Sequence, residues 1–126
     1  MPLVLWVAFG GGIGAAARYG VNVLSGRLIG AEFPWHTLIV NVAGCFAMGL
    51  LTGLMALKLN LPQEMRAFLT TGILGGFTTF SAFSLDFALL VERKAMLAAG
   101  AYAAASVLFS LAAVFAGLHL IRTLLQ

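Results

Sequence analysis

Four long apolar stretches, separated by short polar segments, constrain this chain more than any other feature. We place them near residues 3–25, 35–57, 67–91 and 96–121, and each is long enough for a helix to cross a bilayer, which takes about 20 residues. The chain is 62% hydrophobic and 9% charged, with a mean hydropathy of +1.06. A water-soluble domain of this size does not carry so much apolar surface. We therefore predict an all-α, multi-pass membrane protein with a single domain over residues 1–126.

The segments between the stretches run from Arg27 to Pro34, from Lys58 to Arg66 and from Glu92 to Lys94. Because these connections are short, we expect consecutive helices to be antiparallel neighbours. The net charge of +3 is modest for so apolar a chain, which argues against a nucleic-acid partner. The lipid bilayer is the expected surrounding.

Lysine and arginine do not favour one side of the membrane. Cytoplasmic loops are normally enriched in these residues. Here, with the intramembrane Arg18 left out, four spans place three of them on each side of the membrane. One side has Lys58, Arg66 and Arg122, and the other has Arg27, Arg93 and Lys94. A chain without this bias can insert in both orientations, and two inverted copies can pair about an axis in the membrane plane. The charge pattern thus predicts an antiparallel, dual-topology homodimer.

The third stretch contains an unusual polar centre between Thr70 and Ser84, with three glycines and six hydroxyl residues. Glycine weakens a helix, and hydroxyl side chains compete for its backbone hydrogen bonds. We predict that the third helix is broken near its centre, which would expose backbone groups able to hold ions. The alternative is that the glycines allow close packing and the hydroxyls bond back to carbonyls.

Phe80 and Phe83 lie three residues apart, so they share one helical face, and Thr79 and Ser81 flank them. The edge of a phenyl ring is positive, and a small anion could rest against two such edges while hydroxyl donors replace part of its water shell. We include all four residues in a predicted anion path. The alternative is that the two rings face lipid or a neighbouring helix.

Other polar side chains fall inside the first, second and fourth spans. Asn41 offers two uncharged donors, which suit either an anion site or an interhelical hydrogen bond. Tyr102, Ser106 and Ser110 follow at spacings of four and form one hydroxyl stripe. Arg18 could attract anions into a vestibule, or pair with an acid such as Asp86 or Glu92.

Three motifs together resemble the Fluc, or CrcB, family of fluoride channels, and they cover nearly the whole chain. They are Gly10-Gly11-x-x-Gly14-Ala15-x-x-Arg18-Tyr19, Thr37-Leu38-x-Val40-Asn41-x-x-Gly44-x-Phe46, and Thr71-Gly72-x-x-Gly75-Gly76-Phe77-Thr78-Thr79-Phe80-Ser81-x-Phe83-Ser84. The resemblance implies a dual-topology homodimer in the bacterial inner membrane, with two antiparallel pores. Its implied function is passive, selective fluoride export that protects the cell.

The resemblance also implies roles for particular residues. The fluoride path would be lined by Asn41, Phe80, Phe83, Tyr102 and Ser110. A structural sodium ion at the dimer centre would be held by backbone carbonyls of the broken helix, which here are those of Gly75 and Thr78.

The chain departs from the family pattern at His36, Ala82 and Asp86, where the family more often has a small residue, a hydroxyl residue and glutamate. Ala82 therefore lacks the hydroxyl group that the resemblance implies at this position.

Two other classes of membrane protein compete with the channel. A small multidrug transporter needs a carboxylate deep in the first span, whereas the acids here are Glu32, Glu64, Asp86 and Glu92, all near loops or span ends. A non-transporting assembly subunit would explain the glycines but not the polar third span. An enzyme is not expected, because no nucleophile, base and orienting residue fall at workable spacing on one span.

Overall fold

The computed structural model describes residues 1–126, and its regular structure is entirely helical. The elements are α1 (Leu3–Leu28), α2 (Trp35–Leu57), α3 (Gln63–Arg66), the π-helical segment η1 (Ala67–Leu74), α4 (Gly75–Phe77), α5 (Phe80–Glu92) and α6 (Met96–Leu125). By length and composition, four helical stretches can cross a membrane: Leu3–Leu28, Trp35–Leu57, Gln63–Glu92 and Met96–Leu125. The prediction of an all-α chain with four membrane-spanning helices is confirmed.

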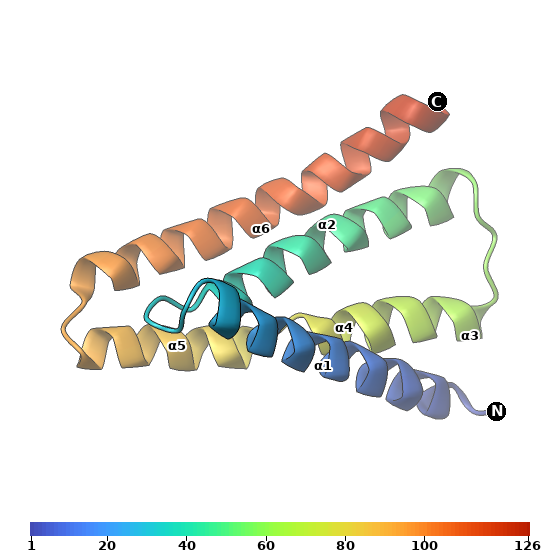
Figure 1. Cartoon of the computed structure of the whole chain (residues 1–126). Coiled ribbons are helices and arrows are strands. Elements are labelled where there is room, and N and C mark those ends of the chain that lie inside the picture. Colours follow the sequence, from blue (N-terminus) through green and yellow to red (C-terminus); the bar gives the residue numbers. More distant parts are fainter.

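Successive spans run in opposite directions, so the two chain termini lie at the same end of the molecule (Figure 1). The closest pairs, however, are not consecutive. The most extensive contacts join α2 to α6, and α1 to η1 and α4, whereas α1 touches α2, and α5 touches α6, over smaller areas. Consecutive spans are therefore antiparallel and in contact, as expected, but the most extensive packing joins spans that are not consecutive.

Glycines explain which helices approach each other. A Cβ atom on Gly10 of α1 would lie 2.5 Å from the carbonyl oxygen of Phe68, and one on Gly76 of α4 would lie 2.6 Å from that of Gly11. On the other pair, a Cβ on Gly117 of α6 would lie 2.5 Å from the carbonyl oxygen of Phe46. At these positions the neighbouring backbone therefore leaves no room for a side chain. Small residues thus select the helix pairs, as they commonly do in membranes.

The third span is interrupted near its middle. Helix α4 ends at Phe77, the next two residues are extended (Thr78 φ −86°, ψ 159°; Thr79 φ −157°, ψ 126°), and α5 begins at Phe80. The Thr79 hydroxyl caps α5 by accepting a hydrogen bond from the Ala82 amide at 3.2 Å. Before the interruption, η1 has the wider turns of a π-helix, a rare form that often occurs at functional sites.

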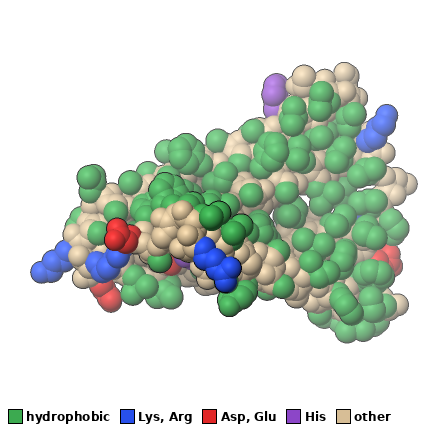
Figure 2. Space-filling view, viewed as in Figure 1, with side chains coloured by type: hydrophobic (Ala, Val, Ile, Leu, Met, Phe, Trp, Pro, Cys, Tyr) green, Lys and Arg blue, Asp and Glu red, His purple; other side chains and the backbone are tan.

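Little of the chain is buried within one copy. Only 18 of 126 residues are buried, and a small cluster of Leu38, Leu90, Ala99 and Tyr102 joins α2, α5 and α6. The face seen in Figure 2 is mostly hydrophobic, with few charged side chains. Large apolar residues are exposed on every span. Lipid or a second copy must cover this surface.

Replacing Gly117 by alanine tests the close contact of α2 and α6. We expect Gly117→Ala to destabilise the protein by about 1–3 kcal/mol, since the added methyl group meets the backbone of Phe46. The measurement is thermal unfolding in detergent. Gly100→Ala on the same helix is the matched control, because its Cβ would meet nothing within 4 Å. Equal unfolding temperatures for the two variants would contradict this packing.

Candidate functional site

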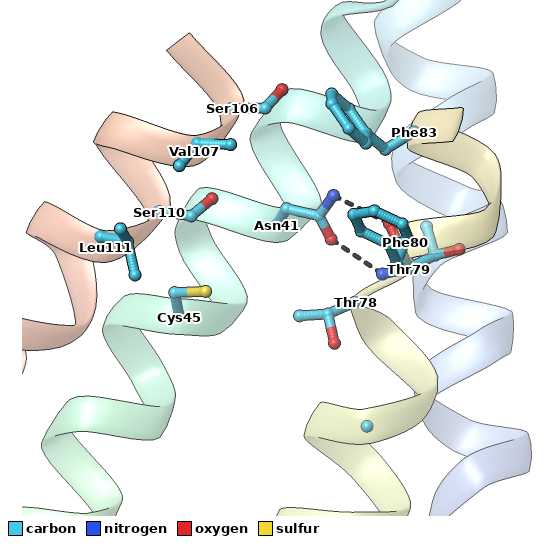
Figure 3. Close-up of a pocket in the computed structure, with 11 residues that line it drawn as sticks. Asn41, Cys45, Thr78, Thr79, Phe80, Phe83, Ser106, Val107, Ser110 and Leu111 are labelled. Carbon is cyan, nitrogen blue, oxygen red and sulfur yellow. Dashed lines mark hydrogen bonds between the residues drawn. The ribbon is translucent and has the colours of Figure 1, made fainter. Parts of the chain in front are cut away.

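A groove of about 520 Å³ lies where α2, the interruption in the third span and α6 meet. Figure 3 shows polar and aromatic side chains converging there from all three elements. The lining residues are Asn41, Cys45, Gly75, Thr78, Thr79, Phe80, Phe83, Ser106, Val107, Ser110 and Leu111. The groove therefore brings together five residues of the predicted anion path (Asn41, Thr79, Phe80, Phe83 and Ser110) and both residues expected to hold sodium (Gly75 and Thr78). None of the lining side chains is acidic or basic.

Asn41 ties α2 to the interrupted backbone through two hydrogen bonds. Its Nδ2 donates to the carbonyl oxygen of Thr79 at 2.9 Å, and its Oδ1 accepts from the amide of Thr79 at 2.8 Å (Figure 3). The bond to Oδ1 pairs the Thr79 amide, which no helix pairs, and the bond from Nδ2 adds to the Thr79 carbonyl, which as the N-cap of α5 also accepts the first bond of that helix. A primary amide has two N–H donors, so one remains for an ion. Asn41 can therefore form the interhelical hydrogen bond and still donate a hydrogen bond to an anion.

Three aromatic rings form a row beside the groove. The centroids of Phe80 and Phe83 are 5.5 Å apart with their planes at 47°, and those of Phe83 and Tyr102 are 5.1 Å apart at 42°. Phe80 is 76% exposed in the single chain, whereas Tyr102 is fully buried. The row thus leads from the open surface to the buried ring of Tyr102 on α6.

Tyr102 ends this row at a polar cluster. Its hydroxyl donates to Asp86 Oδ2 at 3.0 Å, and the hydroxyl of Thr37 donates to the same oxygen at 2.6 Å. Tyr102 does not line the groove itself. Asp86 on α5 therefore accepts hydrogen bonds from the hydroxyls of two other spans, α2 and α6.

Ser106 is a lining residue that the predicted set of path residues did not include. Its side chain is 7% exposed, and its hydroxyl has no hydrogen-bond partner. A buried polar atom without a partner is costly, so this hydroxyl is available to a bound ion. The spacing of four between Tyr102, Ser106 and Ser110 was the sequence signal that could have found it. Cys45 also lines the groove, and its lone thiol gave no such signal.

Arg18 and Ser81 lie outside the groove lining. Arg18 Nε donates to the carbonyl oxygen of Gly76 at 3.1 Å, so this side chain supports the backbone just before the interruption. Asp86, one of the acids considered as its partner, is bonded to Thr37 and Tyr102 instead. Ser81 is within 3.2 Å of the Thr79 hydroxyl, beside the groove.

The carbonyls of Gly75 and Thr78 lose their helical partners at the interruption. In a continuous helix they would accept from the amides of Thr79 and Ala82, four residues later. Those two amides instead donate to Asn41 Oδ1 and to the Thr79 hydroxyl. The carbonyl oxygens of these two groove-lining residues thus lack the partners that a continuous helix would give them.

Removing the Asn41 side chain tests its role in holding the interruption. We expect Asn41→Ala to lower stability by about 2 kcal/mol, because the Thr79 amide loses its partner where water is scarce and the Thr79 carbonyl loses one of its hydrogen bonds. The measurement is thermal unfolding of the purified protein in detergent. Cys45→Ala, one turn along the same groove wall, is the matched control and should unfold near the wild-type temperature. An equally mild effect of both changes would show that the two bonds contribute little.

Comparison with known proteins identifies the family. The sequence model described as CrcB-like protein, Camphor Resistance (CrcB), matches residues 5–118. A protein named fluoride-specific ion channel FluC from Rhodospirillum centenum is 58% identical over 123 residues, which cover 98% of both chains. One of that name from Agrobacterium fabrum is 57% identical over 118 residues and 94% of both chains, and FluC 1 of Nitrobacter hamburgensis is 51% identical over 121 residues and 96% of both. The chain therefore belongs to the CrcB family.

Proposed function

We propose that this protein is a fluoride-selective ion channel that lets fluoride leave the cell passively across a bacterial inner membrane and so limits its toxicity. The observation that carries the proposal is the groove at bilayer depth, which offers uncharged donors and phenyl edges and no ionised group. Its relatives are named as fluoride-specific ion channels. The protein is accordingly a transport protein and not an enzyme.

The chemistry of the groove suits a small anion that must pass through and not stay. Fluoride loses part of its water shell in any narrow path, and the free N–H of Asn41 and the hydroxyls of Ser106 and Ser110 can replace some of those bonds. The edges of Phe80 and Phe83 add weak positive potential. Because no full positive charge is present, binding stays weak enough for release. Thr79, Ser81 and Tyr102 extend this path on either side.

A second copy of the chain completes the channel in this proposal. The groove opens on the surface of the single chain, and Phe80 at its edge is 76% exposed. Polar groups facing lipid would lack partners, and a copy packed over the groove would enclose them. The even division of Lys and Arg favours an inverted copy. Such a homodimer has two equivalent grooves and therefore two antiparallel pores.

A structural sodium ion fits the interruption in the third span. Hard cations take oxygen ligands, and the carbonyls of Gly75 and Thr78 are left without helical partners on the same groove wall. A cation held there would offset the partial negative charge at the carbonyl end of α4 and fix the two copies together. Arg18, through its bond to Gly76, would support the same stretch of backbone. In this assignment Arg18 also contributes positive charge to a vestibule.

The two competing classes explain less. A proton-coupled small multidrug transporter needs an acid in the first span, and α1 contains none. If the protein were a non-transporting assembly subunit, nothing would explain why the Ser106 hydroxyl lacks a hydrogen-bond partner beside an uncharged polar groove.

The inverted dimer predicts the position of the C-terminus. We expect reporter domains fused after Gln126 to be found on both sides of the inner membrane in comparable amounts, because neither orientation is favoured by Lys and Arg. The measurement pairs a reporter active only in the periplasm with one active only in the cytoplasm. Adding three lysines to one loop is the control and should shift the signal to one side. A one-sided signal from the unaltered chain would rule out dual topology.

Fluoride efflux tests the function itself. Purified protein in vesicles loaded with potassium fluoride should release fluoride to an external electrode once valinomycin lets potassium leave. The ring edges predict that Phe80→Ile slows this release by about tenfold, or about 1.4 kcal/mol of barrier, with the dimer intact. Phe115→Ile is the matched control, since Phe115 is similarly exposed (67%) but lies outside the groove.

Two results would contradict these expectations. Retention of fluoride by vesicles that contain the unaltered protein would end the channel proposal, provided that a detergent control empties them. Equal release by both phenylalanine variants would instead assign Phe80 to packing.

A further inference from the structure

The row of aromatic rings continues beyond Tyr102 into the loop between α1 and α2. The ring of Phe33, in this loop, meets that of Tyr102 edge-on, with centroids 5.5 Å apart and planes at 87°. Phe33 also contacts the ring of Trp35, with centroids 4.7 Å apart and planes at 50°. Together with the Tyr102–Phe83 and Phe83–Phe80 contacts, these pairs connect the loop to the groove through successive rings. The proposed function gives no role to Phe33.

The backbone of the loop fixes where Phe33 lies. Gly30 has a φ of +97°, which turns the chain after the end of α1. Pro34 has φ −78° and ψ 63°, and the amide of Trp35 donates to the carbonyl oxygen of Phe33 at 2.8 Å. These angles and this bond form an inverse γ-turn, and the proline ring restricts φ in advance. Phe33 therefore enters α2 through a tight turn.

A second cavity, of about 340 Å³, lies where this loop meets the end of α5 (Figure 1). The charged side chains that line it are those of Glu32, Asp86, Glu92 and Arg93. Beside this cavity, Arg93 Nη2 donates to the carbonyl oxygen of Glu32 at 2.7 Å. This bond ties the residue that precedes Phe33 to the end of α5. The loop is thus held against α5 by the Arg93 bond and against α6 by the Phe33 ring.

Tyr102 is held at both its ring and its hydroxyl. It is fully buried and lines neither the groove nor the second cavity. Its ring contacts those of Phe33 and Phe83, and its hydroxyl donates to Asp86 Oδ2 at 3.0 Å. In a closely packed interior, a ring that loses one contact shifts and moves its neighbours. A change at Phe33 therefore reaches Phe83, which lines the groove.

We propose that Phe33 is a positioning residue of the groove, which through Tyr102 sets the angle at which the Phe83 ring presents its edge to fluoride. The inference rests on the proposed function. Phe33 does not line the groove, so it acts by packing and not by contact with the ion. Aromatic pairs prefer particular angles, and loss of one oriented pair should slow fluoride release about fivefold, or about 1 kcal/mol of barrier.

The test measures fluoride release from proteoliposomes loaded with potassium fluoride, in the presence of valinomycin and per reconstituted oligomer. Phe33→Leu keeps most of the side-chain volume but removes the ring, and should show the fivefold loss, whereas Phe33→Tyr keeps the ring and should release fluoride at nearly the unaltered rate. Phe68→Leu is the matched control. Phe68 forms an edge-to-face pair with Trp6, with centroids 5.8 Å apart, and lines neither cavity, so its loss should leave release unchanged.

A double variant separates positioning from a general loss of folded protein. A folding defect caused by Phe33→Leu would lower release by the same factor in any background. If Phe33 acts through the Phe83 ring, Phe33→Leu should have no further effect once Phe83→Ile has removed that ring. The single Phe83→Ile variant gives the reference rate for this comparison.

Arg93→Gln supplies a second measurement that leaves every ring in place. Because it removes the bond to the Glu32 carbonyl and loosens the loop, it should slow release about twofold, as expected for one exposed hydrogen bond. Lys94→Gln is its matched control, since Lys94 is the next residue and has the same charge, while the bond to the loop comes from Arg93. Lys94→Gln should release fluoride at the unaltered rate.

Several results would overturn the inference while leaving the channel function in place. They are unchanged release by Phe33→Leu, release by Phe33→Tyr as slow as that by Phe33→Leu, or the same loss from Phe33→Leu in the Phe83→Ile background. If Phe33→Leu fails to form the native oligomer on size exclusion, or Phe83→Ile releases too little fluoride to compare, equal rates for Arg93→Gln and Lys94→Gln would overturn it. No release by the unaltered protein would instead refute the proposed function.

Discussion

Backbone groups inside a bilayer have no water to pair with, and the interruption at Thr78 and Thr79 creates several of them in the middle of a span. The structure depends on how they are satisfied. Asn41 bonds both backbone groups of Thr79, the Thr79 hydroxyl caps α5, and Arg18 bonds the carbonyl of Gly76. The carbonyls of Gly75 and Thr78 remain without helical partners. Each feature of the groove follows from this set of bonds, because they fix the extended residues between α2 and α6.

Glycine contacts bring the supporting helices close enough for those bonds to form. Gly10 and Gly76 let α1 lie directly against η1 and α4, and Gly117 does the same for α6 against α2. The resulting pairs meet at the interruption and leave the groove between them. Few apolar side chains are buried in the single chain, so close backbone contact and polar bonds position the site more than a hydrophobic core does.

The two cavities differ in the charge of the side chains that line them. The groove holds uncharged donors and aromatic edges at bilayer depth, where a full charge would be costly and would trap an ion. The second cavity is instead lined by four ionised side chains, those of Glu32, Asp86, Glu92 and Arg93, near the loops, where water and salt moderate their field. Tyr102 and Asp86 stand between the two.

The sequence by itself determined the four spans, their alternating direction and the polar centre of the third, because hydropathy, loop length and helical spacing are properties of neighbouring residues. It also placed Phe80 and Phe83 on one face. Only the tertiary structure decided that non-consecutive helices pair, that Asn41 bonds Thr79, that Arg18 bonds Gly76, and that His36 shares a cavity with Asp86. The tertiary structure also decided that the Ser106 hydroxyl is buried without a hydrogen-bond partner. These facts depend on which backbones can approach each other across the fold. No local sequence pattern shows which residues far apart in the chain will come into contact.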